Sequence, residues 1–420
     1  MKKIFLLLFF FYLLTSWGCT TAVISGKYTR DGRPMLWKNR DTRAINNALR
    51  YFDDGKYAYV GLVNSKDTEG KSIWIGLNSE GFAIMNSASY NLNLDNDDER
   101  NGWEGRIMKK ALATCKTLAD FEALLDQLPR PTGLEANFGV IDASGGAAYY
   151  EVNNYKYVKF DANDPAIAPF GYIIRTNYSH SGPFGLESSG YIRYNAANEL
   201  FYNAVSTYEG ITAQYIQKHV AKNLYHYLTK DKPMITYYHL PPETPKYIHF
   251  RDYIARPITA SSVVVEGVKK GENPSLATLW ANVGFPLASV IVPVWVTKID
   301  LPKIVRYDNV LQDSPISYAA TWLKKYKIMN IRWGKVDHQY ININALVNVK
   351  ETGIDQIIKK HEKIIYAKTY DLLEKWHAKG KPVKKDIKEM YDWLDGYISD
   401  MYHREFRIDL FENTHQNHLK

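Results

Sequence analysis

The chain has 420 residues, of which 45% are hydrophobic and 14% aromatic, so it can form one large or two ordinary domains and is not mainly disordered. Its formal net charge is +8 at pH 7. The basic residues are scattered, with no phosphate-binding glycine loop or zinc-finger spacing beside them, and we predict no nucleic-acid partner. Two cysteines, Cys19 and Cys115, are too few for a disulfide scaffold.

The first eighteen residues are typical of a secretory signal. Lys2 and Lys3 provide a positive start, residues 4–14 form an apolar run, and small residues precede a cut between Gly18 and Cys19. The run is too short to span a bilayer, and no later segment approaches about 18 consecutive apolar residues. We therefore predict a protein that is exported to the periplasm or the extracellular space and has no membrane span.

Strand and helix patterns alternate along the rest of the chain. Strands are predicted at 21–25, 34–38, 57–63, 72–76, 81–86, 136–142, 147–152, 155–160, 172–177, 261–267 and 289–296. Helices are predicted from 103 and from 117, over most of 191–229 with a break at Gly210, and over 351–378 and 383–403. This interleaving indicates sheets covered by helices.

The character of the sequence divides the chain into three parts. Residues 1–18 are the predicted signal peptide, and residues 19–300 are the predicted catalytic domain. Residues 301–420 begin irregularly and end in two charged amphipathic helices separated by the segment Gly380-Lys381-Pro382. We expect these helices to pack on the core or to mediate self-association into a homo-oligomer.

Cleavage before Cys19 would place a thiol and a free α-amine on the same residue. An α-amine has a reference pKa of about 7.7–8.0 and a cysteine thiol one of about 8.5, so the amine can act as the local base near neutral pH. Two other interpretations remain. Cys19 could carry the lipid of a lipoprotein, although Ser16 and Trp17 depart from the usual lipidation pattern, or it could be an ordinary cysteine behind a different cut.

The start of the predicted mature chain resembles the N-terminal-nucleophile hydrolases. The resemblance lies in the run from Cys19 to Val23, the turn at 31–32 and the segment Lys38-Asn39-Arg40-Asp41. It is strongest to the branch that contains choloylglycine (bile-salt) hydrolases, penicillin V acylases, acid ceramidase and acyl-CoA:6-aminopenicillanate acyltransferases. Over residues 19–300 it implies an α+β fold, a four-layer α/β/β/α sandwich, here with a C-terminal helical extension and without cofactor or metal.

The resemblance also implies roles for five residues. The family aspartate that holds the α-amine is Asp41 here. Three later matches follow in the family's order: 76–88, which contains the oxyanion candidate Asn86; 175–178, which contains Asn177; and 188–194, which contains Arg193. With Cys19, these are the predicted catalytic residues.

The chemistry of these side chains suits the roles. A carboxylate at Asp41 can hold an ammonium and raise its basicity, and the amides of Asn86 and Asn177 can stabilise a tetrahedral oxyanion. Arg193 can favour a thiolate or bind a carboxylate. The structural alternatives are a turn aspartate at 41, strand-end amides at 86 and 177, and a surface helix charge at 193.

Four further residues are predicted to bind substrate. The family motif begins with arginine where this chain has Lys38, and Arg40 lies two positions later, so either cation can approach the thiol. Tyr178 and His180 follow Asn177 closely and are expected to line the cleft, with a solvated loop residue as the other interpretation of His180.

These observations together predict a Cys-dependent amidohydrolase, an enzyme that cleaves carbon–nitrogen bonds other than peptide bonds in linear amides. A small N-acyl amide with an apolar acyl part, bile-salt-like or penicillin V-like, would form a thioester on Cys19 that water then hydrolyses. The alternatives are an acyltransferase that passes the acyl group to an amine and a non-catalytic lipoprotein lipidated at Cys19.

Overall fold

A computed structural model of the chain describes residues 18–93, 103–185, 189–207, 210–331 and 339–411. The predicted signal peptide up to residue 17, and Ser188 of the last matched segment, lie outside the described residues. Within the described ranges, no helix combines the length and the apolar character that a membrane crossing needs.

Two antiparallel sheets form the centre of the molecule. The first has the strand order β10-β1-β2-β12-β13-β14, and its strands are β1 (Thr20–Ile24), β2 (Met35–Asp41), β10 (Tyr172–Arg175), β12 (Thr259–Glu266), β13 (Thr278–Val283) and β14 (Val292–Val294). The second is a meander in chain order, formed by β3 (Asn47–Phe52), β4 (Tyr59–Asn64), β5 (Ile75–Asn78), β6 (Ala83–Ala88), β7 (Ala136–Ile141), β8 (Ala147–Val152) and β9 (Tyr157–Asp161). A separate pair joins β11 (Tyr247–His249) to β15 (Tyr340–Asn342).

The two sheets pack face to face, with β1 and β2 of the first against β6 and β7 of the second. Side chains from both sheets fill the layer between them, including Trp37, Leu77, Met85 and Tyr149, all of which are buried. This apolar layer places the first residues of β1 and the last residues of β2 at one rim of the sandwich.

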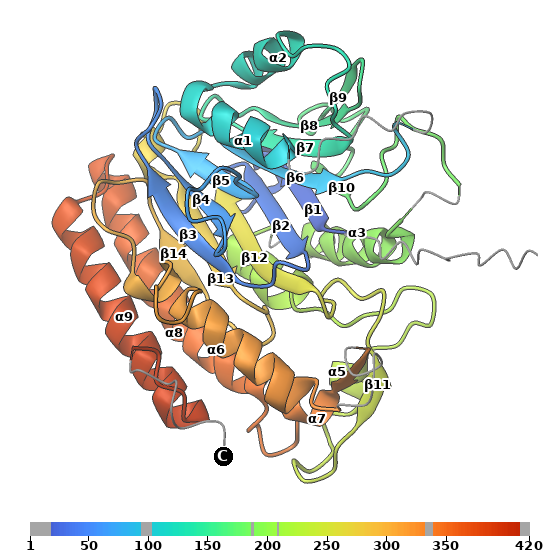
Figure 1. Cartoon of the computed structure of the whole chain (residues 1–420), viewed down its shortest axis with the longest axis vertical. Helices are drawn as coiled ribbons and strands as arrows, with labels where there is room; N and C mark the ends of the chain where they lie inside the picture. The colour runs from blue at the N-terminus through green and yellow to red at the C-terminus, as the bar shows by residue number, and fades with distance from the viewer. Residues whose placement is uncertain (1–17, 94–102, 186–188, 208–209, 332–338, 412–420) are drawn as a thin grey trace, which may run out of the picture.

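Helices cover both outer faces (Figure 1). The described helices are α1 (Trp103–Thr114), α2 (Leu118–Asp126), α3 (Tyr191–Ser206), α4 (Ala213–Tyr215), α5 (Pro233–Thr236), α6 (Pro315–Leu323), α7 (Ile343–Leu346), α8 (Ile354–Lys379) and α9 (Lys384–Phe406). Helix α1 lies on β5 and β6, whereas α3 lies on β1 and β10, and two tyrosine rings of α8 pack at a tilt against Trp280 of β13. The predicted α/β/β/α sandwich is confirmed.

Local sequence explains several helix ends. Thr117 caps α2 by accepting a hydrogen bond from the backbone N–H of Asp120, whose carboxylate accepts one from the backbone of Thr117 in return. Helix α8 ends at Lys379 and is followed by Gly380, which adopts φ +70°, and the backbone N–H of Lys381 then bonds to the carbonyl of Trp376. The Gly-Lys-Pro break between the two last helices is therefore where the sequence predicts it.

The strands β3, β11, β13 and β15 and the helices α5, α6 and α7 are absent from the sequence-based prediction. Residues 221–229, predicted to be helical, contain no helix, and β14 is much shorter than predicted. Strand β3 carries a polar, exposed Arg50 in its middle, and β13 contains the polar residues Thr278 and Asn282, which are buried only by tertiary packing. Local patterns of this kind are overruled by long-range contacts.

The last residue of β12, Glu266, carries a buried carboxyl group. Glu266 accepts a hydrogen bond from Nε1 of Trp280 at 2.9 Å and lies next to Asp31. Burial, reinforced by the neighbouring carboxylate, raises the pKa of Glu266 from its ordinary 4.5 to about 8. The protonated carboxyl therefore makes its full contribution to the free energy of unfolding below pH 4.5, and that contribution is lost as the pH rises through 8.

Glu266→Gln is expected to make the protein more stable than wild type at pH 9, because the amide keeps the hydrogen bonds and cannot ionise. We expect a rise in melting temperature of about 2 °C or more at pH 9 and little or no rise at pH 5. Glu69→Gln, at an exposed carboxylate paired with Lys71, serves as control and should follow wild type at both pH values. Identical pH profiles for Glu266→Gln and wild type would contradict the assignment.

Candidate active site

Cys19 immediately precedes β1 and is partly exposed. The next residue but one, Thr21, accepts a hydrogen bond from the hydroxyl of Tyr149 in the opposite sheet at 2.8 Å. Because side chains alternate along a strand, the thiol of Cys19 faces the same inter-sheet side as Thr21. Cys19 therefore lies at a rim of the sandwich, where it is partly exposed.

Asp41 ends the neighbouring strand β2 with a buried carboxylate. Oδ1 accepts a hydrogen bond from the hydroxyl of Thr259 at 2.6 Å, and Oδ2 accepts one from Nε of Arg256 at 2.8 Å. A β-bulge between Thr259 and Ser261 turns the start of β12 toward β2. Asp41 is therefore a strand-end residue with two fixed partners, not a turn residue.

Arg256 connects Asp41 to the backbone just before Cys19. Its Nη2 donates to the carbonyl oxygen of Gly18 at 2.8 Å, while its Nε donates to Asp41. The bond that links Gly18 to Cys19 thus lies beside a buried ion pair. A Cβ at position 18 would collide with Oδ1 of Asn177, which shows how closely the site encloses this junction.

Arg193 is buried at the start of α3 and points toward the same junction. Its Nη1 donates to the carbonyl of Cys19 and to the hydroxyl of Thr20, both at 2.8 Å, and its Nη2 donates to Oδ1 of Asn177 at 2.7 Å. Burial, together with the like charge of Arg256, lowers the pKa of Arg193 to about 10. This arginine is therefore not a surface helix charge.

Asn177 follows β10 and is completely buried. Besides accepting from Arg193, its amide nitrogen donates to the carbonyl of Ala88 at 3.0 Å, and its backbone N–H donates to Ser189 at 3.1 Å. The side chain is consequently held in one orientation beside Gly18 and Arg193. Rigid placement of this kind is what an oxyanion donor requires, and it is equally compatible with a structural amide.

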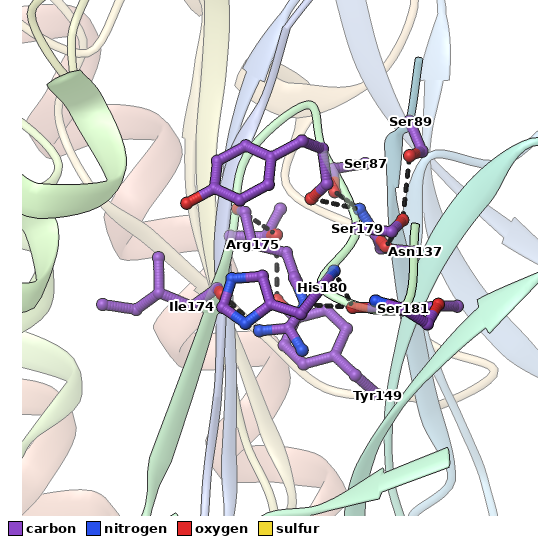
Figure 2. Close-up of polar contacts among 12 residues, drawn as sticks. Ser87, Ser89, Asn137, Tyr149, Ile174, Arg175, Ser179, His180 and Ser181 are labelled. Atoms are coloured by element: carbon purple, nitrogen blue, oxygen red, sulfur yellow. Dashed lines mark hydrogen bonds and ion pairs between the residues drawn. The ribbon is translucent and has the colours of Figure 1, made fainter. Parts of the chain in front are cut away.

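A polar network fixes the loop that carries Asn177 (Figure 2). The hydroxyl of Ser179 donates to Asn137 of β7 at 2.6 Å and lies 2.8 Å from the hydroxyl of Ser89, while the backbone N–H of Ser181 donates to Glu151 at 2.7 Å. Glu151 also pairs with Arg175 at 2.6 Å, a buried ion pair. These contacts tie the loop after β10 to the second sheet.

Lys38 and Arg40 are both buried, and both interact electrostatically with Cys19. Nζ of Lys38 donates to Oδ1 of Asn86 at 2.7 Å and to the carbonyl of Trp74 at 2.8 Å. Burial lowers the pKa of Lys38 to about 8, and the neighbouring Cys19 opposes that shift. Asn86 reaches the site through this lysine.

Arg40 is fixed by two amides. Its Nη1 donates to Asn47 at 2.6 Å and its Nη2 to Asn64 at 2.7 Å, and its guanidinium lies 4.6 Å from the centre of the Trp74 ring. Lys38 and Arg40 therefore both lie on the side of the sheet that the Cys19 thiol faces. Of the two, Lys38 also donates to Asn86, a residue predicted to stabilise the oxyanion.

Tyr178 and His180 lie beside this centre, within an aromatic cluster. In the described part of the chain, neither residue directly contacts Cys19. The rings of Tyr178 and His180 stack at 5.4 Å, and Tyr178 also meets Phe184 and Tyr194, each at 5.8 Å. Phe184 is 70% exposed and presents apolar surface to solvent. Although the residue as a whole is exposed, desolvation of the His180 ring and the nearby charge of Arg175 lower its pKa.

Sequence reasoning brought together most of the residues that meet here but missed Arg256, Thr259 and Trp74. All three contact predicted site residues, and Arg256 touches the Gly18–Cys19 junction itself. The one feature of the sequence that could have indicated Arg256 is the position of this cation shortly before the β-branched run that forms β12. In the described part of the chain, no group of three or more His, Cys, Asp or Glu side chains is placed to hold a metal ion.

No protein-family model matches the chain, and no curated protein is significantly similar to it in sequence. Among solved structures, the chain is similar to a variant of conjugated bile acid hydrolase from Clostridium perfringens, with 11% identity, a TM-score of 0.41 and coverage of 67% of this chain and 93% of that one. It is also similar to penicillin V acylase from Agrobacterium tumefaciens, with 13% identity, a TM-score of 0.36 and coverage of 67% and 87%.

Proposed function

We propose that the chain is an exported amidohydrolase that becomes active when residues 1–18 are removed and Cys19 acquires a free α-amine. The observation that carries this proposal is the convergence of Asp41, Asn177, Arg193 and Arg256 on the Gly18–Cys19 junction. Buried polar and charged groups are costly unless they are paired, and sites that concentrate them are commonly functional.

In the proposed reaction, Sγ of Cys19 attacks the carbonyl carbon of a linear amide while the α-amine accepts the thiol proton. The oxyanion forms against amide donors, with Asn177 and Asn86 as the candidates. The carbon–nitrogen bond then breaks, and the leaving amine takes the proton from the α-ammonium. Water attacks the thioester with the α-amine as base, which releases the acid and regenerates the thiol.

The surroundings of the junction support two further assignments. Arg256 joins Asp41 to the carbonyl of Gly18, the group bonded to the nitrogen of Cys19, and this link supports a role for Asp41 in holding the ammonium form of the new α-amine. The aromatic cluster around Tyr178 and Phe184 lies directly after Asn177 along the chain and offers an apolar surface to an acyl group. A substrate with an apolar acyl part fits this arrangement.

The mature protein is expected to begin at Cys19 with a bare α-amine. N-terminal sequencing and intact-mass measurement of exported protein should give the mass of residues 19–420. A diacylglyceryl adduct on Cys19 would instead identify a lipoprotein, and any other first residue would contradict the proposal.

A substrate panel tests the reaction itself. Bile-acid conjugates, phenoxyacetyl amides and fatty-acyl amides are to be incubated with the mature enzyme, and the released acid and amine measured. Adding an amine acceptor separates hydrolysis from acyl transfer, because a transferase would form the new amide in preference to the free acid. Absence of turnover across the panel would count against the proposed activity.

A further inference from the structure

Strand β3 is the outermost strand of the second sheet, and in the described part of the chain one of its edges has no neighbouring strand (Figure 1). Asn47 shows which backbone groups point to that edge. Its N–H donates to the hydroxyl of Ser317 at 3.3 Å, and its carbonyl accepts from the hydroxyl of Ser314 at 2.7 Å. Because backbone groups alternate along an antiparallel strand, the N–H and C=O groups of Leu49 and Tyr51 point the same way.

The outward backbone groups of Leu49 and Tyr51 are unpaired. Within the described ranges, no other group of the protein bonds to them, whereas those of Asn47 are bonded to hydroxyls. Unpaired N–H and C=O groups along a sheet edge are a template for a further strand. Leu49 and Tyr51 lie about 6.8 Å apart along β3, which is the spacing at which an added strand forms its bonds.

The segment 298–314 covers this edge without pairing with it. At one end of the segment, Nζ of Lys298 lies 3.1 Å from the carboxylate of Asp53, just beyond the end of β3. At its other end, Ser314 bonds to Asn47, the first residue of β3. The segment is much longer than the six-residue strand and contains a 3-10 turn, so it bows away from the strand between these two contacts.

A cavity of about 470 Å³ lies between β3 and this covering segment. It is lined by residues 48–51 of β3 on one side and by residues 298–301 on the other. The apolar residues Ile299 and Leu301 and the aromatic Tyr307 belong to the wall opposite β3. Its volume is within the range of about 300–1,000 Å³ that is typical of ligand sites.

The cavity lies beside the candidate active site and is separate from it. Asn64 lines the cavity and also accepts a hydrogen bond from Arg40 at 2.7 Å. Among the described residues, none of those predicted to form the catalytic or substrate-binding site lines the cavity. A ligand bound there would therefore be additional to the proposed amide substrate.

The charges around the cavity favour a ligand with an acidic group. Lys298 and Arg306 line the cavity, and each pairs with an aspartate. Arg50 also lines it, but in the described part of the chain its exposed guanidinium forms no ion pair and donates to the carbonyl of Thr68. A carboxylate on the ligand would pair with Arg50, with a modest gain because the site is exposed.

The covering segment determines the kind of partner that fits. Bonding to both Leu49 and Tyr51 takes about three residues of extended chain, which is a short stretch of peptide. A second copy of this chain would have to bring its own β3 edge past two covering segments, and segment 298–314 obstructs that approach. A short peptide with a free backbone fits the space that this segment leaves.

We propose that the cavity binds a short extended peptide, which adds to β3 as a further strand through the backbone of Leu49 and Tyr51 and carries an acidic residue toward Arg50. Strand addition of this kind draws its affinity from main-chain hydrogen bonds and its specificity from the side chains that alternate along the peptide. The proposal concerns a second site and does not depend on the amidohydrolase activity.

The probe is the peptide acetyl-Thr-Leu-Thr-Leu-Asp with a free carboxylate, and its binding to the exported protein is measured by isothermal titration calorimetry. Two N-methylated versions test the backbone contacts: one is methylated at both leucines, the other at the second threonine and the aspartate. Successive N–H groups of a strand point to opposite sides, so only one version loses the N–H groups that face β3. We expect that version to bind about tenfold or more weakly than the parent, and the other to bind about as tightly.

Substitutions at position 51 test the same contact from the side of the protein. Tyr51→Pro removes the outward N–H and no bond of the β3–β4 ladder, because this N–H points away from β4. Tyr51→Thr is the matched control, since it removes the same ring and keeps the N–H. We expect Tyr51→Pro to bind the peptide about tenfold or more weakly than Tyr51→Thr does. Arg50→Gln should weaken binding about two- to fivefold.

Several results would overturn the proposal. Strand addition is wrong if the parent peptide does not bind at concentrations up to about 1 mM, or if its two N-methylated versions bind equally. It is also wrong if folded Tyr51→Pro and Tyr51→Thr bind the peptide equally. Decanoate that binds as tightly as the peptide would identify a site for apolar acids instead. If Tyr51→Pro melts early and does not fold, the pair of N-methylated peptides decides.

Discussion

Cys19→Ala is expected to abolish amide turnover, with a loss of about 10⁵-fold or more, while the melting temperature stays close to that of wild type. The thiol is the proposed nucleophile, and no thioester can form without it. The side chain is partly exposed at the start of β1, so its removal leaves little cavity. Steady-state turnover and thermal melting of the mature variant measure the two effects separately.

Cys115→Ala is the matched control because it removes the other thiol. Cys115 is 2% exposed, just beyond the end of α1, and burial raises its pKa to about 11, so the group stays protonated at neutral pH. We expect this variant to lose some stability and to keep its rate per folded molecule. An active Cys19→Ala together with an inactive Cys115→Ala would overturn the assignment of the nucleophile.

Asn177→Ala is expected to lower kcat about a hundred- to thousandfold and to change KM far less, because losing one preorganised oxyanion donor costs about 2.7–4 kcal/mol in the transition state. The side chain is completely buried and held between Arg193 and the carbonyl of Ala88. Its removal also takes away the acceptor of Arg193, the residue that holds the Cys19 carbonyl.

Asn137→Ala provides the control for Asn177. Asn137 is an equally buried amide that anchors the same loop through Ser179, and its contacts are with the loop and the second sheet. We expect it to lower the melting temperature and to spare the rate per folded molecule. If Asn177→Ala shows that same pattern, its amide is structural and the oxyanion is stabilised elsewhere.

The sequence predicts the parts of this site that lie close together along the chain. The β1–β2 hairpin is specified by two β-prone runs around a turn, and its register places Thr21 opposite Lys38. The later segments that contain Asn86, Asn177 and Arg193 supply further candidates. The fold brings Asn177 and Arg193 to the same rim, and it brings Asn86 into contact with Lys38.

The remaining parts depend on contacts that no local pattern encodes. Arg256 meets Asp41, a residue 215 positions earlier in the chain, because β12 pairs with β2 and a bulge near the start of β12 lies next to the residues before the strand. Trp74, which lies directly before β5, meets the Arg40 guanidinium at 4.6 Å only after the two sheets pack. In the sequence Arg256 looks like an ordinary surface cation, and tertiary packing alone buries it.

The crowding around Gly18 bears on the order in which cleavage of the leader and folding take place. A signal peptidase accepts alanine as readily as glycine before the cut, since both are small. The folded site is stricter, because even a methyl group at position 18 would strike the Asn177 amide. If the leader is removed at this junction, as we propose, glycine lets the sandwich close around the junction before the cut, whereas a larger residue would first require the Asn177 amide to move. The identity of residue 18 would then set whether processing can follow folding.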